Sequence, residues 1–267
     1  MKRSILLITL SILILPLLRG QSVTFRTLEN ISYKSGDAYT NERCKLDVRT
    51  PEIPGTYPVV VWFHGGGLTG GNKYFPGELL DEEMVLVSVN YRLSPKVLVK
   101  DCIDDAAAAL AWVFQNIPGY GGNTEEIIVA GHSAGGYLCM MLGMDKKWMA
   151  AYDVDADRIN ALFPFSGHTI THFTVRQERG IPGTQPIIDE MAPLYFVRPD
   201  APPLYLMTGD RDLELLGRYE ENAYMWRMMK VAGHEKVYLL EFDGHDHGAM
   251  VAPGCHILLD YVESLGQ

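Results

Sequence analysis

A serine stands between glycines at the point where an apolar run of the chain ends. Residues 127–138 read IIVAGHSAGGYL, so Ser133 is the centre of a Gly-x-Ser-x-Gly motif. The residues Ile127–Ala130 before it have the pattern of a buried strand, and Ala134–Met144 after it have the pattern of a helix. Such a sharp strand-to-helix turn strains the backbone at the serine and exposes its hydroxyl above the sheet. We therefore interpret Ser133 as a nucleophile; the alternative is a packing turn that happens to contain a serine.

A second glycine-rich turn could stabilise the negative charge that develops when a serine attacks a carbonyl group. The run His64-Gly65-Gly66-Gly67 follows another apolar strand. Because glycine has no side chain, its backbone N–H group can closely approach a substrate oxygen. The first N–H groups of a helix are also free to donate, and one predicted helix begins at Ala134. We expect the N–H groups of Gly66, Gly67 and Ala134 to form an oxyanion hole.

A serine nucleophile needs a base, and the base needs an acid that orients it. Asp210, Asp212 and Glu214 follow one predicted strand, and His245 and His247 follow the next one along the chain. We choose Asp212 as the acid and His247, which stands directly before a glycine, as the base. Asp210 and His245 are the reserve candidates.

Other readings of the histidines are less favoured. The segment His245-Asp246-His247 has two ligand types of a metal site but brings no third and fourth ligand of its own, so no metal is expected. We expect His64 to brace the glycine turn and His132 to support the turn that holds Ser133.

The elements that must position these residues alternate between short apolar runs and longer helical patterns. Strands are predicted at Val23–Lys34, Cys44–Val48, Val59–Phe63, Met84–Asn90, Ile127–Ala130, Ile159–Phe165, Leu204–Thr208 and Val237–Glu241, the first two of them antiparallel. Helices are predicted at Asp101–Gln115, Ala134–Met144, Leu215–Val231 and His256–Ser264. Apolar strands separated by helices predict an α/β fold with a mostly parallel central sheet, flanked by helices on both faces. Sites in such sheets lie at the carboxyl ends of the strands, where the candidate residues fall.

The first twenty residues have a different character from the rest. A basic start, Met1-Lys2-Arg3, precedes the almost wholly apolar run Ser4–Leu18, which is short for a membrane span. This layout is typical of a secretory signal peptide over residues 1–20, so we expect a secreted or periplasmic protein with one domain over residues 21–267. The alternative is an uncleaved membrane anchor.

The charge of the chain restricts its partners. The net charge is −10, and removal of residues 1–20 would make it more negative. Nucleic-acid binding needs basic surfaces and is therefore not expected. We expect no stable membrane association once the signal has been removed, and either a monomer or a homodimer.

The motifs together resemble those of a known superfamily. HGGG, VNYRLSP (89–95), DAAAALAWV (105–113), GHSAGG, TGDRD and DHG occur in order across residues 45–250. In this respect the chain is similar to α/β-hydrolases of the esterase/lipase branch, which includes hormone-sensitive-lipase-like and feruloyl- or acetyl-esterase-like carboxylesterases. The resemblance implies an α/β-hydrolase fold and hydrolysis of carboxylic esters, with no metal or organic cofactor. Within the NYRLSP motif, Arg92 is expected to pair with Asp104 or Asp105.

Two departures favour the compact acetyl- or feruloyl-esterase-like relatives. His132 precedes the serine where hormone-sensitive-lipase-like enzymes usually have Asp, and the chain before His64 is too short for their N-terminal cap. The expected substrate is a small-molecule or carbohydrate-linked ester with a short acyl group. An amidase, formamidase or exopeptidase that uses the same residues is the first alternative, and a non-catalytic binding module is the second.

One segment is expected to shape the substrate pocket. Residues 166–192 lack clear periodicity and lie between two predicted strands on the side of the candidate site. Irregular insertions of this length often form lids or pocket walls. The candidate pocket residues are His64, Phe165, His168 and Phe173.

Overall fold

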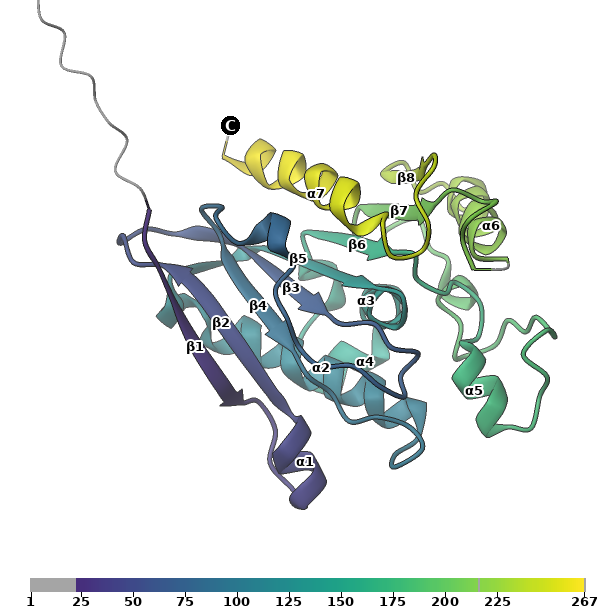
Figure 1. Cartoon of the computed structure of the whole chain (residues 1–267), viewed down its shortest axis with the longest axis horizontal. Coiled ribbons are helices and arrows are strands. Elements are labelled where there is room, and N and C mark those ends of the chain that lie inside the picture. The colour runs from purple at the N-terminus through teal and green to yellow at the C-terminus, as the bar shows by residue number, and fades with distance from the viewer. Residues whose placement is uncertain (1–22, 216, 267) are drawn as a thin grey trace, which may run out of the picture.

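The computed structural model describes residues 23–215 and 217–266. Their centre is one eight-stranded sheet with the strand order β1-β2-β4-β3-β5-β6-β7-β8 (Figure 1). The strands are β1 (Phe25–Ser32), β2 (Lys45–Pro51), β3 (Tyr57–Phe63), β4 (Val85–Val89), β5 (Gly122–His132), β6 (Ala161–Phe165), β7 (Leu204–Gly209) and β8 (Val237–Phe242). The expected signal peptide, residues 1–20, lies outside the described residues.

Only the first two strands break the parallel arrangement. β1 pairs antiparallel with β2, and β2 pairs antiparallel with β4. All pairs from β4 to β8 are parallel, so the carboxyl ends of these strands meet at one edge. β3 and β4 are buried along most of their length, as strands covered on both faces must be.

Helices cover both faces of the sheet. The α-helices are α1 (Ala38–Arg43), α2 (Val99–Asn116), α3 (Ala134–Met144), α4 (Lys147–Ala150), α5 (Phe173–Glu178), α6 (Arg218–Val231) and α7 (Val251–Leu265). Short 3-10 turns lie at η1 (Gly77–Leu79), η2 (Ile117–Tyr120), η3 (Ala156–Arg158) and η4 (Pro193–Phe196). One apolar core lies between the sheet and α2, α3 and α6, and a second lies beneath α7 and η1. The predicted α/β architecture with helices on both faces is confirmed.

The differences from the expected elements lie at their ends and in the loops. β5 begins at Gly122, five residues before the apolar run that signalled it, because Gly122 already pairs with Tyr57 of β3. The residues between Gly122 and Ile127 are polar and gave no strand signal. α7 begins at Val251 rather than His256, since Pro253 lies in its first turn, where no N–H donor is needed. The irregular segment 166–192 contains α5, and Figure 1 shows α5 and the loop after it standing away from the sheet.

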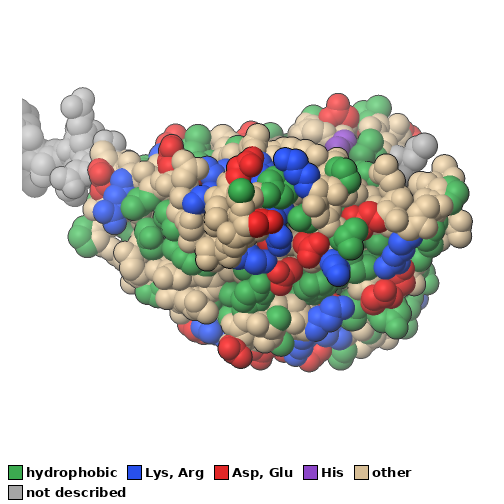
Figure 2. All heavy atoms as spheres, turned by 90° about the horizontal axis from the view of Figure 1, so that it is seen from below, with side chains coloured by type: hydrophobic (Ala, Val, Ile, Leu, Met, Phe, Trp, Pro, Cys, Tyr) green, Lys and Arg blue, Asp and Glu red, His purple; other side chains and the backbone are tan. Residues whose placement is uncertain are grey.

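Two further observations concern the surface. No helix among residues 23–215 and 217–266 is long and apolar enough to cross a membrane. On the face shown in Figure 2, basic and acidic side chains are interspersed, and the described part of this face has no extended field of one sign.

A buried ion cluster ties the first loops to α2. Asp105 is fully buried and accepts two hydrogen bonds from the guanidinium group of Arg92, both of 2.7 Å, and one of 2.7 Å from Lys34. Lys34 also reaches Asp104, which is partly exposed. Burial alone would raise the pKa of Asp105, but its hydrogen bonds from Arg92 and Lys34 outweigh burial and lower that pKa. Of the two carboxylates expected for Arg92, the structure selects Asp105.

We expect Asp105→Asn to lower the free energy of unfolding by about 3 kcal/mol, because it leaves two basic groups without their buried counter-charge. Asp104→Asn is the matched control and should cost less than about 1 kcal/mol, because Asp104 is partly exposed to water. Urea denaturation monitored by circular dichroism measures both values. Equal costs for the two variants would show that the buried position has no special role.

Candidate active site

The backbone at Ser133 has a conformation that side chains rarely adopt. β5 ends at His132, α3 begins at Ala134, and Ser133 between them has φ 56° and ψ −113°. Its N–H group donates to the carbonyl of Phe165 at the end of neighbouring β6, at 2.7 Å. The turn therefore holds Ser133 above the carboxyl edge of the sheet, as the motif predicts.

The glycines around Ser133 are required by close backbone contacts. A Cβ atom on Gly131 would lie 2.6 Å from the backbone of Gly135, and one on Gly135 would collide with the carbonyl oxygen of Phe63. A Cβ on Gly136 would lie 2.9 Å from Gly167. The motif thus allows α3 to start directly against β3 and the β6 loop.

The triple-glycine turn lies beside the serine. A Cβ on Gly65 would lie 3.4 Å from the Cβ of Ser133, and Gly66 and Gly67 have positive φ values of 111° and 64°. The N–H groups of Gly66 and Gly67 donate to no other described residue. Ala134 is the first residue of its helix, where the N–H group has no partner within the helix. The three N–H groups expected to form the oxyanion hole are therefore free of backbone partners among the described residues.

His247 is held through one ring nitrogen. Its Nδ1 lies 2.5 Å from Oε1 of Glu214 and 2.9 Å from Oγ of Ser166. Its backbone carbonyl accepts from Nε2 of His132, the residue before Ser133, at 2.8 Å. Because Nδ1 is occupied, Nε2 is the nitrogen that can exchange a proton with a nucleophile.

The carboxylate beside His247 is Glu214, not the expected Asp212. Asp212 is exposed, and its N–H group donates to Oδ1 of Asp210 at 2.9 Å. Asp210 is not the partner of His247 either, because its side chain accepts a hydrogen bond from the N–H group of Gly244. The N–H group of Glu214 donates to the carbonyl of Asp210, so the chain makes one helical turn after β7. This turn directs Asp212 outward and Glu214 inward.

The surroundings of Glu214 stabilise its charged form. Burial alone would raise the pKa of Glu214, but hydrogen bonds from His247, from the Leu215 N–H group and from Ser166 outweigh burial and lower that pKa to about 2. The Gly209 N–H group also donates to this carboxylate, at 3.0 Å. Glu214 therefore remains ionised and can balance a positive charge on His247 at any moderate pH.

Ser166 and Arg218 join this cluster without having been predicted. Ser166 is fully buried at the end of β6, has φ 49° and donates from Oγ to Glu214 at 2.7 Å. Arg218, 1% exposed, donates from its guanidinium group to the carbonyl of Ser166 and also pairs with Glu221. A Ser-Gly pair directly after a predicted strand was the available signal for Ser166. No local pattern marked Arg218.

Two of the expected pocket residues serve the scaffold instead. Phe165 is fully buried and packs edge-on against Trp62 on the α7 side of the sheet, because its strand register directs it away from Ser133. His64 stacks on Tyr91 and lies against the backbone of the glycine turn, which is its expected bracing role. Burial lowers the pKa of His64 and of His132 to about 4, so both are neutral at neutral pH.

The other two expected residues lie near the glycine turn. The ring of Phe173 is 3.0 Å from the position a Cβ would take on Gly67, and the hydroxyl of Thr174 donates to the Gly67 carbonyl at 2.6 Å. The ring of His168 lies 5.4 Å from that of Phe173, between centroids, and lines a cavity of about 450 Å³. The segment 166–192 thus packs against the glycine turn and contributes to this cavity.

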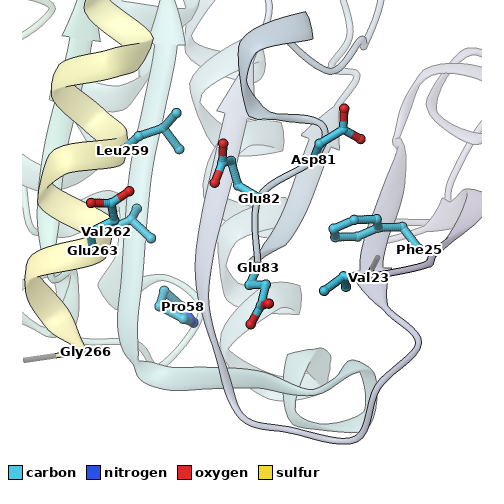
Figure 3. Close-up of a pocket in the computed structure, with 10 residues that line it drawn as sticks. All are labelled: Val23, Phe25, Pro58, Asp81, Glu82, Glu83, Leu259, Val262, Glu263 and Gly266. Atoms are coloured by element: carbon cyan, nitrogen blue, oxygen red, sulfur yellow. The ribbon is translucent and has the colours of Figure 1, made fainter. Parts of the chain in front are cut away.

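A larger cavity, of about 760 Å³, lies at the other end of the sheet (Figure 3). Pro58 at the start of β3, Glu83 before β4 and Glu263 on α7 line it. It contains several carboxylates but none of the residues around Ser133. No group of three or more His, Cys, Asp or Glu in the described ranges is placed to hold a metal ion.

Known proteins resemble this chain in sequence and in fold. The probable carboxylic ester hydrolase LipM of Mycobacterium tuberculosis is 29% identical over 228 residues, which cover 75% of this chain and 52% of LipM. This chain therefore spans about half the length of that relative.

Two solved structures confirm the α/β-hydrolase fold. A truncated carbohydrate esterase from gut microbiota superposes with a TM-score of 0.76 at 17% identity, covering 92% of this chain and 97% of that one. Esterase 2 of Thermogutta terrifontis superposes with a TM-score of 0.70 at 21% identity, covering 92% and 96% of the two chains.

The BD-FAE family model matches residues 46–216, which include the triple-glycine turn, Ser133, Ser166 and Glu214. The match covers more than half of the chain. The resemblance suggested by the motifs is thereby confirmed: this chain is a member of the BD-FAE family, with the α/β-hydrolase fold.

Proposed function

We propose that this chain is a serine carboxylesterase in which Ser133, His247 and Glu214 form the catalytic triad. The observation on which the proposal rests is that the buried, charged carboxylate of Glu214 lies 2.5 Å from Nδ1 of His247. The backbone of His247 in turn accepts a hydrogen bond from His132, in the turn that exposes Ser133. The relative LipM, named a probable carboxylic ester hydrolase, supports the same class of reaction.

The proposed reaction has two halves. Oγ of Ser133 attacks the ester carbonyl carbon while its proton passes to Nε2 of His247, and Glu214 stabilises the resulting imidazolium. The N–H groups of Gly66, Gly67 and Ala134 hold the oxyanion. The alcohol then leaves with the proton from His247. In the second half, His247 removes a proton from water as the water oxygen attacks the acyl carbonyl carbon. The bond from this carbon to Oγ of Ser133 then breaks, His247 returns the proton to Oγ, and the carboxylic acid is released.

Ser166 is proposed to position this pair. Its hydroxyl donates to Oε2 of Glu214, so the carboxylate presents Oε1 to the histidine. Arg218 in turn fixes the backbone of Ser166, whose positive φ would otherwise be unfavourable. A cluster from β6, the loop after β7 and the loop after β8 therefore holds the base in one orientation.

We further propose a short acyl group, acetyl or feruloyl, and a carbohydrate or small alcohol as the other part of the ester. The ring of Phe173 against Gly67 supports a restricted space beside the oxyanion donors. The structural neighbour described as a carbohydrate esterase is consistent with a carbohydrate alcohol.

Replacement of Ser133 by Ala should lower kcat for 4-nitrophenyl acetate by at least about a thousandfold, because no other group can form the acyl-enzyme. A fluorophosphonate probe should label the wild type at Ser133 and leave the variant unlabelled, as mass spectrometry of the peptides would show. Comparable turnover by the variant would rule out Ser133 as the nucleophile.

Glu214→Gln should reduce kcat roughly a thousandfold or more, because the neutral amide cannot stabilise the histidine cation and favours the wrong tautomer. Asp212→Asn is the matched control and should change kcat by no more than about twofold, since Asp212 is exposed and away from His247. Steady-state kinetics with 4-nitrophenyl acetate decides between the two. The reverse order of effects would restore Asp212 as the acid.

Hydrolysis of 4-nitrophenyl acetate should exceed that of the octanoate and of the matching anilide, 4-nitroacetanilide. The octanoyl chain must pass Phe173, and the anilide requires protonation of a far poorer leaving group. Initial rates that depend on Ser133 are compared for the three substrates. Faster cleavage of the anilide would favour the amidase alternative over the esterase.

A further inference from the structure

A buried arginine of the insertion has no acidic partner. Arg176 on α5 is 4% exposed, and its Nη1 donates to the carbonyls of Gly183 at 2.6 Å and Gln185 at 2.8 Å. Its Nε has no hydrogen-bond partner, and no carboxylate oxygen of the described residues lies within 4.0 Å of its guanidinium group. A buried charge without a counter-charge is costly, so a ligand that supplied one would be favoured.

Two neighbouring arginines, by contrast, are paired with carboxylates. Arg179, one turn further along the chain, pairs with Asp189 and Glu190. Arg218, which is buried still more completely, pairs with Glu221 at 2.8 Å. Arg176 is therefore held in place by backbone carbonyls while its charge remains uncompensated.

Arg176 lines the cavity of about 450 Å³ described above. Six of the lining residues present side chains of mixed polarity: His168, Ile170, Arg176, Thr184, Pro186 and Glu221. His168 is also buried, and its Nε2 has no partner among the described residues. The cavity thus offers an arginine, an imidazole and a hydroxyl group to a ligand, and its volume lies within the range of small-molecule pockets.

Glu221, the one carboxylate lining this cavity, is already compensated. Its Oε1 accepts from Arg218, and its Oε2 accepts from the N–H group of Ile170 at 3.3 Å. Nδ1 of His168 also lies 2.8 Å from Oε1. The net charge presented by the cavity wall is therefore the positive charge of Arg176.

Two series of side-chain contacts connect the residues that line this cavity to the proposed catalytic centre. Phe173 separates His168 from the oxyanion glycine Gly67. On the other side, Glu221 is connected through Arg218 to Ser166, which contacts His247.

We infer that this cavity binds a carboxylate group carried by the substrate, with Arg176 as the residue that determines specificity. The inference rests on the proposed esterase function and narrows its substrate class to anionic esters. Because the proposed acyl group is short, the alcohol part of the ester is the part that would occupy the cavity. We therefore place the carboxylate on the alcohol part. A carboxylate at the end of the acyl chain has the same chemistry, and the experiment separates the two.

The test compares charged and neutral ester pairs. For the alcohol part the pair is 4-acetoxybenzoate and 4-acetoxybenzamide; for the acyl part it is 4-nitrophenyl hydrogen adipate and 4-nitrophenyl hexanoate. Rates without enzyme are subtracted. The wild type should hydrolyse at least one charged ester with a kcat/KM about tenfold or more above that of its neutral partner, as expected of a charge-assisted hydrogen bond. The pair that shows the preference identifies the position of the carboxylate.

Arg176→Gln should abolish the preference, because it removes the charge while keeping hydrogen-bond donors. Arg179→Gln is the matched control and should retain it, since Arg179 is already paired. Survival of the preference in Arg176→Gln overturns the inference. The comparison of charged and neutral esters does not need the Arg176 variant, so it remains decisive even if Arg176→Gln does not fold. Hydrolysis that depends on Ser133 but shows no preference for a charged ester also overturns the inference.

Failure of the proposed function gives a different result. In that case no ester is hydrolysed in a Ser133-dependent manner. Calorimetric titration of the wild type with adipate and with the neutral adipamide then tests the cavity alone. Tighter binding of adipate supports the carboxylate site, and equal or no binding of both overturns it.

Discussion

The constraint on which the site depends is the sharp reversal of the chain at Ser133. Positive φ at a non-glycine residue is unfavourable, and here it is maintained by a hydrogen bond to β6 and by the start of α3 against β3. These contacts leave room only for glycine at Gly131 and Gly135. The parallel sheet makes the arrangement possible, because it brings the carboxyl ends of β3, β5, β6, β7 and β8 to one edge.

The polar groups at this edge form one connected network. Glu214 contacts His247 and Ser166, Ser166 contacts Arg218, and Arg218 contacts Glu221. Buried polar groups are costly unless they are satisfied, so a network of this kind fixes the orientation of each member. Burial also raises the pKa of Glu221 to about 7, whereas Glu214, with more donors, keeps a low pKa. This network therefore joins Glu214, the proposed catalytic acid, to Glu221, which lines the proposed substrate cavity.

The insertion after β6 connects this network to the cavity proposed to determine substrate specificity. It supplies Ser166 at its start, Phe173 beside the triple-glycine turn and Arg176 at the cavity. In the scaffold, by contrast, Arg92 pairs with the buried Asp105 through two hydrogen bonds. Arg176 has no such carboxylate among the described residues, and we propose that a ligand supplies one.

The sequence alone determined the positions of the strands along the chain, the mostly parallel sheet and the turn around Ser133, because apolar runs and closely spaced glycines are local signals. It also limited the acid to three residues after β7 and the base to two after β8. Only the tertiary structure decided between them: one helical turn directs Glu214 inward and Asp212 outward, and both fit the same sequence pattern. Phe165, Ser166, Arg176 and Arg218 were also settled by packing, because the contacts that give them their places join segments far apart in the chain.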